Sequence, residues 1–578
     1  MIEASFGWRY SPSNPPAIRF QAPLKILIAN RNEEVLPLLA EAEATSRAGY
    51  WVALMISYEA APAFDPAMKT RPPGGLPLVW AAVFSSSTES ANQSEETGFE
   101  IGAWEPLVSH DEFGKAILRI REFIAAGDTY QVNYTFPLVA TFKGDPLSWF
   151  RRLCSAQGAA YCAYFDLGRY QILSISPELF FEQEGRAIRT RPMKGTIRRG
   201  RWPDEDMRMA EQLAGSAKDR AENVMIVDLL RNDLGRVAVP GSVKVTSLFE
   251  LERYETLWQM TSTIEATLRT EVGFPEVMAK LFPCGSITGA PKIRTMEIIR
   301  ELEPFHRGVY TGTLGFLRPG GSGIFNVAIR TVVVDAEQGL ATFGVGGGIT
   351  YDSTVEREYE ECLVKSSFLN SETVEFELLE SLLLDDSRFF LAERHVARMK
   401  ASAAYFGFRF NEAEIDTALF SLSRDYCVGR WKVRLLSGPS GAVSAQVTRL
   451  EDPKPGRLRV ALANQPVSCK DKFLFHKTTN RKLYDDALAA RSDCDDVILW
   501  NENGEATEST VANLVIRVGD ELLTPPRSAG LLAGVFREEL VVNGQIRERS
   551  ISRDDLAKAS ELFLINSVRK WMRATLVI

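Results

Sequence analysis

The stretch from Arg307 to Thr350 reads RGVYTGTLGFLRPGGSGIFNVAIRTVVVDAEQGLATFGVGGGIT. Glycine-rich or polar turns separate three apolar runs in it, a pattern typical of strands in an antiparallel meander. The three predicted strands are Val309–Leu317, Ile324–Val334 and Ala341–Thr350. Helical patterns precede and follow them, at Asp206–Asn232 and Val355–Phe368. Helices mixed with antiparallel strands predict an α+β fold rather than a parallel doubly wound sheet.

The chain has 578 residues, too many for one hydrophobic core, and we expect about two to four domains. Its 67 Lys and Arg against 75 Asp and Glu give a net charge of −8, so no basic field indicates nucleic acid. The sequence shows no apolar run of roughly 18 residues that could span a membrane, and no secretory signal. Seven cysteines without a C-x-x-C pair argue against a disulfide framework or a structural zinc site. We therefore expect a cytoplasmic enzyme without membrane partners.

The hydrophobic pattern restarts after the last helix of the first part. A strand-like run at Phe376–Leu384 and a helical run with a basic face at Leu391–Tyr405 follow a short polar segment. We therefore predict two parts, residues 1–371 and 372–578. The Ser-, Glu- and Asn-rich stretch Ser85–Gly98 is predicted to be a surface loop.

Charged residues recur at helical spacing near the end of the first part. Glu358, Glu361 and Lys365 fall at i, i+3 and i+7, which places them on one helix face. Two close carboxylates repel each other unless a cation lies between them, and Mg²⁺ is a natural partner. A solvated acidic face with Lys365 as its helix partner is the alternative that this spacing leaves open.

Two glycine-rich segments resemble phosphate loops only superficially. Gly285–Lys292 lacks the G-x-x-x-x-G-K-[ST] spacing, and Pro291 has no amide hydrogen to donate. In Gly344–Thr350, backbone amides such as those of Gly346 and Gly347 could still bind a carboxylate. Ordinary tight turns are the alternative explanation for both segments.

Nine segments of the first part follow one another in a characteristic order. They are GDTYQVN at 127–133, SISPELF at 174–180, TRPMKGT at 190–196, residues 218–236, FPCGSITGAPKIR at 282–294, RGVYTG at 307–312, AIRT at 328–331, and residues 344–350 and 356–365. This set resembles the chorismate-utilising enzymes, which include anthranilate synthase component I and aminodeoxychorismate synthase component I. The resemblance implies a two-layer α/β sandwich with a deep central site.

The resemblance also implies roles for carboxylates and for substrate-binding groups. Glu222 and Glu361 match Mg²⁺ ligands, with Glu358 nearby, and the metal would neutralise the ring carboxylate of chorismate. Glu178 matches the general acid that protonates the departing C4 hydroxyl, a role that needs a pKa raised by burial. The residues that match substrate-binding positions are Tyr310 and Arg330, which grip the enolpyruvyl carboxylate, together with Gln131, Gly346, Gly347 and Lys365.

Two positions distinguish the subfamilies of chorismate-utilising enzymes. Water-adding members carry a lysine base where this chain has Gln131, so the resemblance argues against hydration. Anthranilate synthases have alanine where this chain has Lys194, whereas aminodeoxychorismate synthases have lysine there. Such a lysine can form a covalent adduct at C2 before ammonia attacks C4. A cation that pairs with a carboxylate is the alternative role for Lys194.

Four segments of the second part form another ordered set. They are ERHVARMKAS at 393–402, FHKTTNR at 475–481, ATESTVANL at 506–514, and TPP at 524–526 followed by GLLAGVFR at 530–537. This set resembles the fold-type IV pyridoxal phosphate enzymes, which include aminodeoxychorismate lyase, branched-chain aminotransferases and D-amino-acid aminotransferases. The resemblance implies that pyridoxal 5'-phosphate is the cofactor of the second part.

Lys477 matches the lysine that forms the Schiff base with this cofactor, and Lys482 is the competing candidate. Glu508 matches the carboxylate that keeps the pyridine nitrogen protonated, which makes the ring an electron sink. Arg398 matches the phosphate-binding arginine. Backbone amides near Val535 and Phe536 match its helpers, although relatives often have a hydroxyl residue at the position of Phe536. A surface role for Arg398 and a capping role for Glu508 are the alternatives.

Together the two resemblances imply the synthesis of 4-aminobenzoate for folate from chorismate in two steps. Neither part shows the G-x-C-x-G loop of a glutamine amidotransferase, so a separate subunit or free ammonium would supply ammonia. A homodimer through the second part is also expected. Two alternatives remain at this stage: an anthranilate-type synthase, and a second part that is a cofactor-free scaffold.

Overall fold

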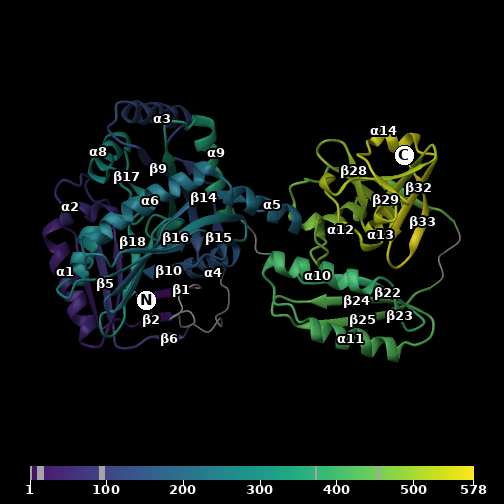
Figure 1. Ribbon diagram of the computed structural model, residues 1–578, viewed down its shortest axis with the longest axis horizontal. Coiled ribbons are helices and arrows are strands. Elements are labelled where there is room, and N and C mark those ends of the chain that lie inside the picture. The colour runs from purple at the N-terminus through teal and green to yellow at the C-terminus, as the bar shows by residue number, and fades with distance from the viewer. Residues whose placement is uncertain (1–2, 9–17, 90–97, 371–373, 452–455, 578) are drawn as a thin grey trace. The chain divides into compact units, whose positions relative to one another are not determined.

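The computed structural model describes residues 3–8, 18–89, 98–370, 374–451 and 456–577, and it contains two compact units (Figure 1). The first unit comprises Met1–Arg198 and Ala210–Thr373, and the second comprises Arg199–Met209 and Val374–Ile578. The sequence patterns did not predict that Arg199–Met209 belongs with the second unit. Residues 90–97 of the expected surface loop and residues 371–373 at the expected boundary lie outside the described residues.

Two large sheets form the centre of the first unit. The first sheet has the strand order β17-β9-β21-β20-β11-β10-β1-β2-β6, and β7 and β8 also pair with β9. Its strands are β1 (Glu3–Trp8), β2 (Ile18–Gln21), β6 (Thr88–Glu89), β7 (Phe99–Ile101), β8 (Glu105–Pro106), β9 (Gln131–Gly144), β10 (Tyr161–Asp166), β11 (Tyr170–Ser176), β17 (Gly289–Ala290), β20 (Thr331–Asp335) and β21 (Leu340–Ile349).

The second sheet has the order β14-β16-β13-β12-β19-β18-β4-β5-β3, and β15 also pairs with β16. Its strands are β3 (Lys25–Ala29), β4 (Trp51–Ile56), β5 (Val79–Phe84), β12 (Leu179–Glu184), β13 (Ala187–Arg191), β14 (Met193–Arg198), β15 (Lys244–Arg253), β16 (Leu257–Thr267), β18 (Thr313–Leu317) and β19 (Gly323–Val327).

Aromatic side chains fill the space between the two sheets. Phe6 and Phe20 from the first sheet share one core with Phe84 and Phe316 from the second, and the rings of Phe6 and Phe316 are 4.8 Å apart. One set of helices packs on the first sheet, namely α3 (His110–Ala125), α4 (Pro146–Gln157), α8 (Lys292–Leu302) and α9 (Val355–Ser366). Another set packs on the second sheet, namely α1 (Asn32–Arg47), α2 (Ala61–Phe64), α6 (Ala217–Gly235) and α7 (Phe274–Leu281). Two packed layers, each a sheet with its helices, confirm the α+β prediction.

The predicted meander is wrong at its middle strand. The run Ile324–Val334 is two strands, β19 and β20, and they belong to different sheets. Between them Arg330 has a φ of 50°, a left-handed conformation that strands do not adopt. The chain therefore crosses from one layer to the other at this point, and it leaves Arg330 at the crossing. Apolar residues on both sides hid this break from the hydrophobic pattern.

The predicted helical stretch Asp206–Asn232 is also divided in the structure. One helix, α5 (Pro203–Ala214), ends before Ser216, and α6 begins after it. The Ser216 hydroxyl accepts a hydrogen bond from the backbone N–H of Asp219 at 3.3 Å, which caps α6. The chain returns to the first unit at Ala210, within α5 and a few residues before this break.

The second unit contains two further sheets, of four and eight strands. The smaller sheet, in the order β23-β22-β24-β25, consists of β22 (Leu378–Asp385), β23 (Arg388–Phe389), β24 (Arg430–Ser437) and β25 (Val443–Arg449). The larger, in the order β28-β27-β26-β33-β32-β29-β30-β31, consists of β26 (Leu458–Leu462), β27 (Asp496–Trp500), β28 (Ala506–Ser509), β29 (Asn513–Val518), β30 (Glu521–Thr524), β31 (Arg547–Glu548), β32 (Glu561–Asn566) and β33 (Lys570–Leu576). The helices are α10 (Ala392–Phe406), α11 (Glu412–Asp425), α12 (Lys482–Ala489), α13 (Val535–Val542) and α14 (Arg553–Lys558).

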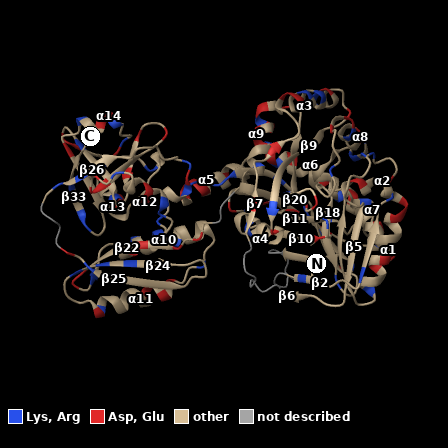
Figure 2. Ribbon diagram, turned by 180° about the vertical axis from the view of Figure 1, so that it is seen from behind, with Lys and Arg blue, Asp and Glu red and all other residues tan. Residues whose placement is uncertain are grey.

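Two elements that the sequence predicts in this unit are confirmed. The strand expected at Phe376–Leu384 and the helix expected at Leu391–Tyr405 correspond to β22 and α10. All seven cysteines are free. In the part of the chain that the structure describes, no helix has the length and apolar character to cross a membrane. Lys and Arg are interspersed with Asp and Glu along both units, in line with the modest net charge (Figure 2).

Two candidate active sites

Lys194 on β14 is half-buried and is the centre of the site in the first unit. Burial lowers the pKa of its amine below the ordinary value, and the nearby charge of Lys365 lowers it further. The carboxylates of Glu222, Glu178 and Glu361 oppose this shift. Since these charges all act on Lys194, the fold brings together five of the predicted site residues from four separate sequence motifs.

Glu178 lies between β11 and β12 and is only 3% exposed. Its backbone N–H donates to the Ser176 hydroxyl at 3.2 Å, and its carbonyl accepts from the N–H of Val327 at 3.0 Å. Burial raises the pKa of its carboxyl group to about 7, although a hydrogen bond with Ser286 and the charge of Lys194 lower it in part. A substantial fraction of Glu178 is therefore protonated near neutral pH, as a general acid requires.

The glycines of Gly344–Thr350 lie in strand β21, paired with β9, so the tight-turn explanation is wrong for this segment. A Cβ on Gly348 would overlap the side-chain amide of Gln131 and lie 2.9 Å from Lys194 Nζ. A Cβ on Gly344 would overlap the ring of Tyr310. Because alternate residues share a face of a strand, Gln131, Lys194 and Tyr310 lie over the same face of β21.

We expect the substitution Gly348→Ala to lower the rate of chorismate consumption at least about tenfold, because the new methyl group displaces Gln131 and Lys194. Turnover in the second unit should be unchanged. The matched control is Gly98→Ala, since nothing lies within 4 Å of a Cβ at that position. Steady-state rates with chorismate would test this, and equal rates for the two variants would contradict it.

Arg330 and Tyr310 are fixed by different neighbours. Arg330 Nη1 donates to the side-chain oxygen of Gln157 at 2.8 Å, and burial lowers the pKa of its guanidinium. The Tyr310 ring covers Gly344, and burial raises the pKa of its hydroxyl. Arg330 keeps further N–H donors for a carboxylate, because a guanidinium has five.

The three carboxylates predicted to bind Mg²⁺ each have other interactions. Glu361 Oε1 is 2.9 Å from Lys365 Nζ, which also donates to the carbonyl of Gly346 at 2.9 Å. Glu222 Oε1 is 3.8 Å from Lys218 Nζ. Burial raises the pKa of Glu358, and the neighbouring charge of Glu361 adds to this. In the described residues, no three or more His, Cys, Asp or Glu side chains are arranged to hold a metal, so the Mg²⁺ site remains a prediction.

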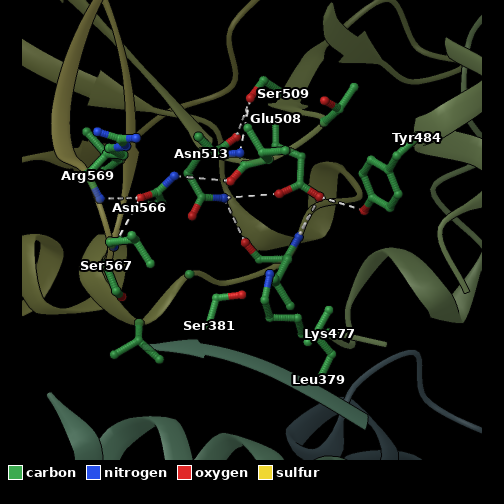
Figure 3. A pocket seen from close by; sticks show the side chains of 18 of the residues that line it. Leu379, Ser381, Lys477, Tyr484, Glu508, Ser509, Asn513, Asn566, Ser567 and Arg569 are labelled. Atoms are coloured by element: carbon green, nitrogen blue, oxygen red, sulfur yellow. Dashed lines mark hydrogen bonds between the residues drawn. The ribbon is translucent and has the colours of Figure 1, made fainter. Parts of the chain in front are cut away.

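A cavity of about 490 Å³ marks the site in the second unit (Figure 3). Four of the predicted residues line it, namely Lys477, Glu508, Arg398 and Val535. The Phe536 side chain instead packs against Phe390 in a separate core, with ring centroids 5.8 Å apart. The predicted contribution of its backbone amide, at the beginning of α13, remains a prediction.

Glu508 is 4% exposed and lies on β28 at the wall of the cavity. Its carboxyl group accepts hydrogen bonds from the Tyr484 hydroxyl at 2.9 Å, the backbone N–H of Leu532 at 3.1 Å and the Asn513 amide at 3.2 Å (Figure 3). Burial raises its pKa to about 7. The capping alternative is therefore wrong, because Glu508 is a buried strand residue at the centre of a hydrogen-bond network.

Lys477 lines the same cavity, and its carbonyl accepts a hydrogen bond from the N–H of Leu379 at 2.9 Å. Burial lowers the pKa of its amine to about 8, and the charge of Arg398 contributes to the shift. At this pKa a useful fraction of the amine is neutral and nucleophilic near pH 7. The competing candidate Lys482 is exposed at the beginning of α12, so the structure favours Lys477.

Arg398 on α10 is oriented by a buried carboxylate that sequence reasoning missed. Its Nε and Nη2 donate to the two oxygens of Glu380 at 2.8 and 2.7 Å, and Nη1 donates to the Ala533 carbonyl at 3.0 Å. The carboxylate of Glu380 also pairs with His395 Nδ1 at 2.7 Å. The surface alternative for Arg398 is therefore wrong. Tyr484 was missed as well, although it follows the FHKTTNR motif closely, whereas Glu380 sits in an ordinary apolar strand without any signal.

Comparisons with known proteins match two families to successive parts of the chain. Residues 13–371 match the family described as chorismate binding enzyme, and residues 377–577 match amino-transferase class IV. Aminodeoxychorismate synthase component 1 of Salmonella typhimurium is 44% identical over 263 residues, which cover 46% of this chain and 58% of that protein. Anthranilate synthase component 1 of Streptomyces coelicolor is 39% identical over 286 residues, which cover 49% of this chain and 55% of that protein.

A solved structure, anthranilate synthase component I from Streptococcus pneumoniae, has the same fold in the first unit. It superposes with a TM-score of 0.55 at 23% identity and covers 63% of this chain and 94% of that one. The matched region spans less than two thirds of the length of the curated relatives. Since the first family covers most of the chain, the protein belongs to the chorismate binding enzymes, and it carries a class IV aminotransferase domain in its second part.

Proposed function

We propose that the protein converts chorismate to 4-aminobenzoate and pyruvate in two steps, one in each unit. The observation that carries the proposal is the same in both units. Each holds a lysine, Lys194 or Lys477, whose pKa burial lowers and whose charge interacts with a buried glutamate, Glu178 or Glu508, whose pKa burial raises to about 7. Such pairs of perturbed groups are typical of catalytic sites.

The first step replaces the C4 hydroxyl of chorismate by an amino group. The neutral amine of Lys194 attacks C2, the ring double bond shifts, and the C4 hydroxyl leaves as water with a proton from Glu178. Ammonia then attacks C4 and expels Lys194 from C2, so one ammonia enters and one water leaves. Arg330 and Tyr310 would hold the enolpyruvyl carboxylate during both displacements.

Two residues favour amination at C4 over the other reactions of the family. Gln131 has no basic amine with which to activate water, so hydration at C2 is disfavoured. Lys194 occupies the C2 side of the site, where an anthranilate synthase must admit ammonia. Curated relatives that are 44%, 42% and 43% identical are named aminodeoxychorismate synthase component 1, which supports the same choice.

The second step removes pyruvate from the aminated product and leaves the aromatic ring of 4-aminobenzoate. Pyridoxal phosphate, when bound, supplies the electron sink for this elimination. Lys477 would hold the cofactor and then take the proton from C4 of the substrate. Glu508 would keep a proton on the ring nitrogen, and Arg398 with the backbone amides of Val535 and Phe536 would hold the phosphate.

The proposal includes a metal ion and protein partners. Glu222, Glu361 and Glu358 offer the hard oxygen ligands that Mg²⁺ prefers, and the ion would stabilise the ring carboxylate of chorismate. A glutamine amidotransferase subunit would supply ammonia, and the chain would form a homodimer through the second unit.

An endpoint assay tests the proposed function directly. Purified protein is incubated with chorismate, Mg²⁺, ammonium and pyridoxal phosphate, and the products are resolved by mass. We expect 4-aminobenzoate and pyruvate in equal amounts. A chelator should stop chorismate consumption, whereas the conversion of supplied aminodeoxychorismate should continue. Anthranilate as the product would contradict the role of Lys194. Accumulation of aminodeoxychorismate would show that the second unit is a scaffold or a different enzyme.

The amination rate should fall as pH rises through about 7, because Glu178 acts in its protonated form and its pKa is raised to about 7. Rates are measured between about pH 6 and 9 and corrected for the fraction of free ammonia. Glu178→Gln should lose the fall in rate through about pH 7 and lower kcat by about a hundredfold or more. Glu182→Gln, on the following strand, is the control, and an unchanged pH profile in Glu178→Gln would exclude Glu178 as the acid.

A further inference from the structure

Arg199–Met209 lies within the residues that match the chorismate binding family, yet it packs in the second unit. It directly follows β14, the strand that carries Lys194. A buried ion pair between Arg199 and Asp206, with Nε and Oδ1 2.7 Å apart, shapes the segment. The Tyr405 hydroxyl on α10 donates to the carbonyl of Gly200 at 2.7 Å, and Arg199 Nη2 donates to the carbonyl of Tyr405 at 3.1 Å.

The Trp202 side chain of this segment completes an apolar core of the second unit. Trp202 is 8% exposed, and its ring packs against Phe475 with centroids 5.0 Å apart and ring planes tilted by 31°. Leu474, Val497 and Leu499 belong to the same core. Trp202 is the largest of the buried side chains in this core, so Phe475 would lose part of its cover without the indole.

The backbone of the same segment fixes His476, the residue before Lys477. His476 Nε2 is 3.2 Å from the carbonyl of Arg201, and Nδ1 is 2.9 Å from the Ser402 hydroxyl. A carbonyl can only accept, so Nε2 carries the hydrogen and Nδ1 accepts from Ser402. This neutral tautomer agrees with burial, which lowers the pKa of His476 to about 3.

The other side of Lys477 is held by the beginning of β22 and by the residue before it. The N–H of Leu379 donates to the carbonyl of Lys477 at 2.9 Å, and the N–H of Thr479 donates to the carbonyl of Glu377 at 2.9 Å. The peptide around Lys477 is therefore fixed from two sides. One side belongs to the class IV aminotransferase match and the other is Arg199–Met209.

We propose that Trp202 and the backbone carbonyl of Arg201 are positioning groups for Lys477, so that elimination in the second unit depends on a segment of the chorismate binding region. The inference rests on the proposed function of Lys477. Trp202 and Arg201 do not touch the reacting atoms; they hold Phe475 and His476, and these hold the backbone of Lys477. Displacement of a catalytic amine by about 1 Å is enough to lower a rate up to a hundredfold.

The test uses the full chain with Trp202→Ala. We expect kcat for supplied aminodeoxychorismate to fall about ten- to hundredfold while KM changes little. The dissociation constant for pyridoxal phosphate, followed by its absorbance between about 410 and 430 nm, should rise about tenfold. In the cofactor-free protein, the amides of residues 475–479 should exchange with deuterium faster than in the parent. Trp202→Phe should restore most of each property, and chorismate amination should be unchanged.

The matched control is Trp431→Ala, because Trp431 on β24 packs against Tyr426 in a different core of the same unit, with centroids 4.9 Å apart. Equal losses in the two alanine variants would overturn the proposal, since they would indicate a general loss of stability. Parent-like exchange, affinity and kcat in Trp202→Ala would also overturn it. If the parent protein shows no absorbance with the cofactor, the function proposed for Lys477 is wrong, and the exchange measurement still decides whether Trp202 positions residues 475–479.

Discussion

Replacing Lys194 by methionine is expected to lower the rate of chorismate amination at least about a thousandfold, because the nucleophile that opens C4 is lost. Methionine has about the length of the lysine stem and packs in the same space, so the site should keep its shape. The substitution also removes a positive charge from beside the neighbouring carboxylates, but it introduces no group that could replace the lysine as nucleophile. Conversion of supplied aminodeoxychorismate should continue at the parent rate, because Lys477 is untouched.

The measurement for Lys194 is aminodeoxychorismate formation with saturating ammonium and Mg²⁺, resolved by mass. Lys244→Met is the control, since Lys244 is an exposed lysine on β15. A variant that keeps more than about a tenth of the parent rate would show that Lys194 is only a cation that pairs with a carboxylate. Anthranilate from Lys194→Met would show that the lysine selects the position of attack rather than performing it.

Replacing Lys477 by alanine should abolish 4-aminobenzoate formation, with a loss of at least about a thousandfold, and aminodeoxychorismate should accumulate from chorismate. The amine would no longer be available either to hold pyridoxal phosphate or to move the proton from C4. The absorbance between about 410 and 430 nm should disappear even when excess cofactor is present. Chorismate consumption should be unaffected.

Lys482→Ala provides a matched control for this experiment. Lys482 lies a few residues further along the chain, at the exposed beginning of α12, and it is the other lysine that the motif allowed. We expect parent-like spectra and rates for it. If Lys477→Ala forms pyruvate at the parent rate while Lys482→Ala does not, the assignment of the two lysines is reversed.

The fold class could be predicted from the sequence because strands and helices each bury a periodic set of apolar residues. The exact path of the chain could not. Between β19 and β20 the apolar pattern continues without a gap, and the change of sheet depends on the left-handed conformation of Arg330. A backbone angle of this kind has no signal in hydrophobic periodicity.

The candidate sites show the same limit. Residues within dense motifs, such as Lys194 and Glu508, were recognised because their neighbours in sequence are also unusual. Glu380 was missed because a single carboxylate in an apolar strand has no pattern, and its role follows only from the side chains of Arg398 and His395 that pack on it. Contacts between distant segments are decided by tertiary packing, which one sequence does not display.

The placement of Arg199–Met209 also bears on whether evolution can separate the two coding regions. A gene split after residue 371 would put Trp202 on one polypeptide and Phe475 and His476 on the other. The downstream product would then carry an uncovered aromatic face and a histidine without its carbonyl acceptor. The cover of the aromatic face and the carbonyl acceptor of the histidine would return only if the downstream product bound the upstream product. Splitting the gene at this point would therefore impair the second unit, and the placement of Arg199–Met209 favours the retention of a single reading frame.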